Sequence, residues 1–116
     1  MIQEQFGTEQ IKSAVHKVVE EYRANPIDLL NVGDGAGELN YLGLLSGSYV
    51  TTIAALVRRI PAPARILELG TFLGAVSVTL QRLGYELTAS DIPEFVQNAA
   101  LQRRLKAEGI PRSEAT

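Results

Sequence analysis

The chain has 116 residues, enough for one compact domain with its own core and too few for two. An apolar fraction of 46% and a charged fraction of 21% are typical of ordinary globular proteins and exclude a disordered or fibrous chain. The net charge of -2, without a basic block, predicts no nucleic-acid surface, and the absence of cysteine excludes disulfides, zinc-thiolate sites and a cysteine nucleophile.

The amino-terminal residues 1–5 (MIQEQ) lack the basic stretch and apolar run of a signal peptide. Further along the chain, no uninterrupted apolar run approaches the roughly 20 residues that cross a bilayer. We therefore expect a cytoplasmic protein without a membrane partner.

The segment Thr8–Ala24 predicts an amphipathic helix. Its apolar residues recur mainly at offsets of three and four and so share one face: Ile11, Val15, Val18, Val19 and Tyr22. Thr8 is expected to cap the start of this helix, and Asn25-Pro26 to end it. His16, the only histidine, has charged neighbours and is expected on a solvated face rather than in catalysis.

Three glycines then fall within five positions, in NVGDGAG at residues 31–37. This composition favours a flexible connection, although a phosphate-binding loop is an alternative. A second helix is predicted over about residues 39–60, with a bend or break near residues 46–48 because Gly43 and Gly47 weaken its first half. Tyr41 and Tyr49 of this helix are expected to pack in apolar contacts, with contact to a bound ligand as the alternative.

After Pro61 the pattern changes to alternating strands and helices. Residues 64–69 form a short apolar run, typical of a strand covered on both faces. A turn is predicted from Gly70 to Gly74, and a helix from Ala75 to Leu83, capped by Gly84.

A second strand is predicted at Glu86–Ser90, with Asp91 at its carboxyl end. Pro93 suits the first turn of a further helix, which Gly109 ends. Residues 110–116 are expected to be a frayed tail or the approach to a third strand that the chain itself does not contain.

The order strand, helix, strand, helix predicts parallel strands joined by a right-handed crossover. The expected fold is therefore α/β, with an amino-terminal helical region (1–60) followed by a partial Rossmann-like β-α-β-α unit (61–116). A sheet of two strands leaves apolar surface and strand edges uncovered, so a chain of this kind would be marginally stable alone.

Four residues around the first strand and the second strand point to a ligand. Ligands of open α/β sheets bind at the carboxyl ends of the strands, and Gly70 and Gly74 let the intervening turn pass close to one. Glu68 can attract an ammonium group, while Asp91 can accept hydrogen bonds from a ribose diol. Backbone N–H groups of the following helix favour a carboxylate. Together they describe a pocket for an amino acid joined to a nucleoside.

The run ILELGTFLG, residues 66–74, resembles motif I of the class I S-adenosylmethionine-dependent methyltransferases. Glu68, Gly70 and Gly74 match its acid and glycines, whereas Phe72 stands where the middle glycine usually is. The stretch LGYELTASDIPEF, residues 83–95, is similar to the second strand of that family. The resemblance implies that Asp91 binds the ribose, that Ile92 covers the adenine, and that Thr71 and Phe72 also contact the bound S-adenosylmethionine.

Other interpretations remain open at this point. A nicotinamide-binding Rossmann unit also has glycines after a strand, but its G-x-G-x-x-G spacing is not met by GTFLGAV. Gly70 and Gly74 would serve any strand-to-helix turn, and Asp91 would serve as a helix cap.

Compared with the methyltransferase family that it resembles, the chain lacks the later strands that carry the acceptor half. No catalytic base, metal site or acceptor pocket is visible in the sequence. The chain is therefore expected to be the donor-binding part of a methyltransferase of unknown acceptor, either as a fragment or as a homo-oligomer that completes the sheet. The alternative is a non-catalytic, methyltransferase-like module that binds another protein through its sheet edge.

Overall fold

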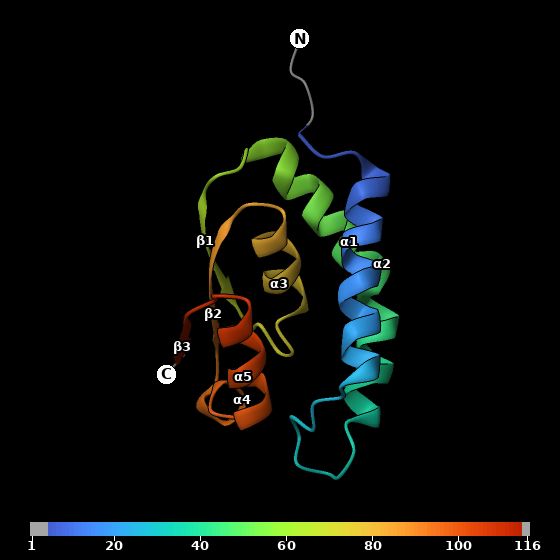
Figure 1. Ribbon diagram of the computed structural model, residues 1–116, viewed down its shortest axis with the longest axis vertical. Helices are drawn as coiled ribbons and strands as arrows, with labels where there is room; N and C mark the ends of the chain where they lie inside the picture. Colours follow the sequence, from blue (N-terminus) through green and yellow to red (C-terminus); the bar gives the residue numbers. More distant parts are fainter. Residues whose placement is uncertain (1–4, 115–116) are drawn as a thin grey trace.

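Three parallel strands in the order β1-β2-β3 form the sheet of this chain, for which the computed structural model describes residues 5–114 (Figure 1). Residues 1–4, which the signal-peptide prediction concerns, and the last two residues of the predicted tail lie outside the described residues. Within the described range the elements are α1 (Thr8–Ala24), α2 (Ala36–Arg59), β1 (Arg65–Leu69), α3 (Ala75–Arg82), β2 (Glu86–Asp91), α4 (Pro93–Val96), α5 (Ala99–Ala107) and β3 (Arg112–Glu114). The mixed α/β class and the parallel strand order predicted from the sequence are confirmed.

The third strand goes beyond the two-stranded sheet expected from the sequence. β1 runs parallel to β2 with Leu69 opposite Ser90, and β2 runs parallel to β3 with Asp91 opposite Glu114. The tail was expected to fray or to lead to a strand outside the chain, and both expectations are wrong for Arg112–Glu114, which itself forms the third strand. With only three residues, β3 was too short to show a periodic signal in the sequence.

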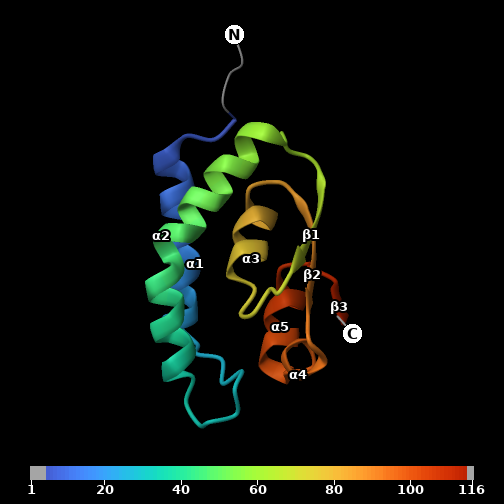
Figure 2. The same cartoon turned by 180° about the vertical axis from the view of Figure 1, so that it is seen from behind.

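The helices cover one face of the sheet in two layers. α3 and α5 lie against the sheet, and the long antiparallel pair α1 and α2 lies beyond α3 (Figures 1 and 2). The other face of the sheet is open, because the side chains of Leu67 and Leu69 on β1 are 58% and 73% exposed. The expectation that β1 is covered on both faces is therefore wrong. An apolar run this short has the same sequence pattern whether one face of the strand or both faces are covered.

The predicted apolar face of α1 is confirmed residue by residue. Its five members, Ile11, Val15, Val18, Val19 and Tyr22, are all buried, and they join side chains of the sheet and of α3 in one cluster. The two regions predicted from the sequence, 1–60 and 61–116, therefore share one core. The predicted cap is wrong by one position, since Gly7 precedes the helix and Thr8 is its first residue.

α2 is one continuous helix, which corrects the break predicted near residues 46–48. The hydroxyls of Ser46 and Thr51 donate to the carbonyls of Gly43 and Gly47, at 3.0 and 3.2 Å, in the middle of the helix. The helix also packs along α1, so tertiary contacts outweigh the low helix propensity of the two glycines.

The glycine-rich connection before α2 has a defined conformation. The Asp28 carboxylate accepts hydrogen bonds from the N–H groups of Val32 and Gly33, at 2.9 and 3.0 Å. Gly35 precedes α2 with φ +76°, and a Cβ there would lie 2.8 Å from the carbonyl oxygen of Ile27. Only glycine fits at position 35. The backbone packing of the connection therefore explains why at least this one of its three glycines is present.

The helix predicted after Pro93 is divided into α4 and α5. Asn98 stands between them, and its side-chain oxygen accepts a 3.0 Å hydrogen bond from the N–H of Leu101. The side-chain amide of Asn98 also donates to the carbonyl of Asp28 at 3.1 Å. This asparagine is an N-cap in the middle of an apolar pattern, so the pattern alone predicted a single helix.

α2 is long and apolar enough, by length and composition alone, to cross a membrane. Its most apolar window has a mean hydropathy of 1.2, although polar residues interrupt every long apolar run. Only 17% of that window is buried, yet Leu42, Ile53 and Val57 belong to the core. The core helix of a soluble protein, which is mostly buried, passes the same test, so length and hydropathy alone do not identify a membrane span.

Candidate functional site

The candidate site lies where β1 and β2 end, around the bend Gly70–Gly74. Thr71 donates its N–H to the carbonyl of Ser90 at 2.9 Å, and Gly74 donates to the carbonyl of Thr71 at 2.8 Å. Gly70, Phe72 and Gly74 have φ angles of +71°, +53° and +80°. This left-handed conformation is natural for glycine and costly for Phe72, so the bend needs outside support.

Glu68 occupies the inner side of the bend. Its Oε1 accepts two hydrogen bonds of 2.7 Å, from the hydroxyls of Thr71 and Ser77. Burial raises the pKa of the Glu68 carboxyl and the nearby charge of Asp91 adds to the rise, while the two hydroxyls oppose it. Both hydroxyls use the same oxygen, so part of the acceptor capacity of Glu68 is committed to holding the bend.

Asp91 supports the outer side of the same bend. Its Oδ2 accepts a 2.8 Å hydrogen bond from the N–H of Phe72, and its Oδ1 accepts a 2.7 Å bond from the N–H of Ile92. The carboxylate at the end of β2 therefore holds Phe72 in its left-handed conformation. Each carboxylate oxygen has two lone pairs, so each retains one for a ligand.

Glu68 and Asp91 thus lie on the same side of the molecule, beside Gly70. The sequence prediction depended on this, because carboxylates that faced different sides of the sheet could not share one ligand. Gly70 borders open space, with nothing within 4 Å of where a Cβ would be. Gly74 differs, since a Cβ there would lie 3.0 Å from Cδ2 of Leu105 in the core. At position 74 the positive φ and the close contact with Leu105 both favour glycine, so its presence there is explained by the protein's own packing.

An aromatic row adjoins the two carboxylates. The ring of Phe72 meets the ring of Tyr41 edge-to-face at 5.6 Å and that of Phe95 at 5.9 Å, between ring centroids. Tyr41 is 52% exposed, and Ile92, which follows Asp91, is 45% exposed. Burial raises the pKa of Tyr49, the second tyrosine of α2, and the charge of Glu68 and Tyr41 add to the rise.

Sequence reasoning missed three residues that support the site. Ser77 had a usable signal, since a hydroxyl in the first turn of a helix commonly faces the preceding loop. Phe95 and Tyr22 looked like ordinary members of an apolar face. In the structure, the Tyr22 hydroxyl donates to the Leu73 carbonyl from behind the bend. Arg104 covers the Tyr22 ring, with its guanidinium carbon 5.0 Å from the ring centroid.

Neither a metal site among the described residues nor a match to a known protein bears on the interpretation of this bend. Across residues 5–114 no group of three or more His, Asp or Glu side chains is placed to hold a metal ion. Compared with known proteins, the chain matches no protein-family model and has no significant match among curated proteins or solved structures. The interpretation of the site therefore depends on its own geometry.

Proposed function

We propose that this chain is the S-adenosylmethionine-binding part of a class I methyltransferase whose acceptor is unknown. The observation that carries the proposal is that Glu68 and Asp91, at the ends of adjacent parallel strands, flank one bend that is open at Gly70. In open α/β sheets this edge is where nucleotide-like ligands bind.

The residues present fit the two ends of such a donor. The free lone pairs of Asp91 suit the ribose diol, and the carboxyl group of Glu68 suits the ammonium group. The exposed side chain of Ile92 and the ring of Phe72 offer apolar surface to an adenine. Bound S-adenosylmethionine supplies an electrophilic methyl group, and the protein's part is chiefly to hold it in line with an acceptor. We assign no catalytic residue.

Titration calorimetry with S-adenosylhomocysteine tests the proposal. Asp91→Ala should weaken binding at least about tenfold, because two hydrogen bonds to a charged group are lost. Glu94→Ala is the matched control, since it removes an exposed acid three residues away and should leave the dissociation constant unchanged. Circular dichroism confirms that both variants are folded.

Two outcomes would contradict the assignment. One is a folded Asp91→Ala variant that binds as tightly as the wild type. The other is binding of a nicotinamide dinucleotide in preference to S-adenosylhomocysteine, which would favour the competing Rossmann interpretation.

The second candidate function is a non-catalytic module that pairs through its sheet. It is favoured by the exposed Leu67 and Leu69, and by the fact that, among the described strands, β1 pairs only with β2. An uncovered edge with apolar neighbours is a template for another strand. This function predicts no donor affinity and a complex that Leu67→Lys abolishes, so light scattering combined with the titration separates the two candidates.

A further inference from the structure

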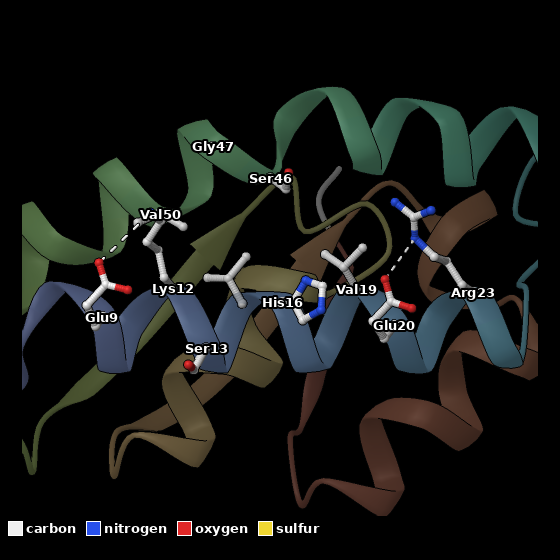
Figure 3. A pocket seen from close by; sticks show the side chains of 11 residues that line it. Glu9, Lys12, Ser13, His16, Val19, Glu20, Arg23, Ser46, Gly47 and Val50 are labelled. Atoms are coloured by element: carbon white, nitrogen blue, oxygen red, sulfur yellow. Dashed lines mark ion pairs between the residues drawn. The ribbon is translucent and has the colours of Figure 1, made fainter.

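A groove of about 440 Å³ runs between α1 and α2, on the side of the molecule away from the sheet (Figure 3). Val19 of α1 and Val50 of α2 line it, together with Ser46 and Gly47, where a Cβ at Gly47 would meet nothing within 4 Å. Charged and polar side chains of α1 stand along it, in the order Glu9, Lys12, Ser13, His16, Glu20 and Arg23.

The four charged residues of α1 that line the groove form a sign-reversed mirror about His16, whereas Lys17 and Glu21 do not line it. Glu9 and Arg23 each lie seven residues from it, and Lys12 and Glu20 each lie four residues from it. In both pairs the two members carry opposite charges. An antiparallel copy of the same helix, centred on His16, would therefore place both groove-lining acids, Glu9 and Glu20, opposite bases.

We propose that this groove is the interface with a second copy of the chain, with the two α1 helices antiparallel and the twofold axis at His16. Both helices rise by the same distance per residue, so the register holds along the whole contact. A twofold interface is self-complementary, and Glu9 then meets Arg23 of the second copy while Lys12 meets Glu20, each contact occurring twice. This inference is independent of donor binding.

The ion pairs within the monomer leave these side chains available. Lys12 and Glu9 are 3.9 Å apart with side chains 62% and 90% exposed, and Arg23 and Glu20 are 3.4 Å apart with side chains 56% and 53% exposed. Such exposed pairs contribute little to stability, so they can exchange partners at little cost.

α2 extends the same face with a surface that carries no charge. None of the 19 residues from 39 to 57 is charged, and only 17% of the apolar window of this helix is buried. Leu44, which is 74% exposed, lies beside Gly43 and Arg23 at one end of the helix pair. A second helix pair would cover part of this apolar and small-residue surface, as in a four-helix bundle.

Charge reversal tests the proposed register. Sedimentation velocity of the wild type, at chain concentrations from about 1 to about 300 µM, should detect a dimer. Weak polar interfaces have dissociation constants within this range. Arg23→Glu should raise the dimer dissociation constant at least about tenfold, because two attractive contacts become repulsive. Adding Glu9→Arg to that variant should restore the dimer, although within each chain the second substitution places a like charge beside Lys12.

Cross-linking tests the position of the axis. The chain has no cysteine, so His16→Cys introduces one thiol per copy, close to its symmetry mate. Under mild oxidation it should give a disulfide-linked dimer. Lys17→Cys, an exposed neighbour that does not line the groove, is the control and should remain largely monomeric.

Four results would overturn the proposal. The first is a wild-type monomer over the whole concentration range. The second is failure of the double charge reversal to recover the dimer. The third is equal cross-linking of the two cysteine variants. The fourth is a wild type that sediments with phosphatidylcholine vesicles through α2 instead of pairing with itself. Leu67→Lys, on the open sheet face, should leave this dimer intact and thereby separate it from association through β1.

Discussion

The backbone N–H of Phe72 donates a 2.8 Å hydrogen bond to Oδ2 of Asp91, so the end of β2 fixes the bend that follows β1. Asp91 therefore has a structural part in addition to the ribose contact that we propose. Asp91→Ala should lower the free energy of unfolding by about 1–3 kcal/mol, because Phe72 loses its charged partner. Asp91→Asn keeps an acceptor oxygen and should lose less. Urea denaturation measures both, and equal values for the two variants would argue against this bond.

Gly70 and Gly74 have the same backbone conformation in different surroundings. Gly70→Ala should cost about 1 kcal/mol, because the left-handed conformation is strained but the space is open. Gly74→Ala should cost clearly more, since its Cβ would also press on Leu105. Thermal unfolding of the two variants compares them directly, and an equal loss in both would contradict the packing at Gly74.

Tyr22 is 2% exposed, and its hydroxyl is the hydrogen-bond partner of the Leu73 carbonyl. Tyr22→Phe should destabilise the chain by about 1–3 kcal/mol, because a buried carbonyl loses its donor. Tyr41→Phe is the control, since Tyr41 is half exposed and its hydroxyl makes no hydrogen bond within residues 5–114. Hydrogen exchange should also become faster in the bend of the Tyr22 variant. Unchanged exchange there would mean that Tyr22 does not support the bend.

Glu21 connects three helices through Arg82 and Arg104, at distances of 2.7 and 2.8 Å. Hydrogen bonds from Arg82, with a contribution from Arg104, lower the pKa of Glu21 from 4.5 to about 2 against the opposing effect of burial. A carboxyl whose pKa falls on folding stabilises the protein above the unfolded value and loses that contribution as pH falls towards the folded value.

Glu21→Gln should therefore cost about 1–2 kcal/mol at pH 7, a value reduced for the partial exposure of the pair. The difference from the wild type should shrink between about pH 4.5 and about pH 2. Protonation of Glu68, whose pKa shifts the other way, occurs in both proteins and cancels in the comparison. Melting temperatures across that pH range check this, and a difference independent of pH would contradict it.

The proximity of the two carboxylates was predictable because Glu68 lies at the end of the first predicted strand and Asp91 directly follows the second. Parallel strands bring their carboxyl ends to one edge, so the sequence positions of Glu68 and Asp91 predict their proximity. The supporting residues could not be found in this way. Tyr22 is 51 residues from Leu73 along the chain, and only the packing of α1 against α3 joins them.

The sequence by itself determined α1, β1, β2 and the bend between the strands, because periodicity, glycines and prolines act over a few residues. Tertiary structure decided the rest: the continuity of α2 despite Gly43 and Gly47, the cap at Asn98 and the strand Arg112–Glu114. It also decided that one face of the sheet stays open at Leu67 and Leu69. Local propensities amount to about 1 kcal/mol per residue, so contacts between distant segments decide wherever they outweigh that amount.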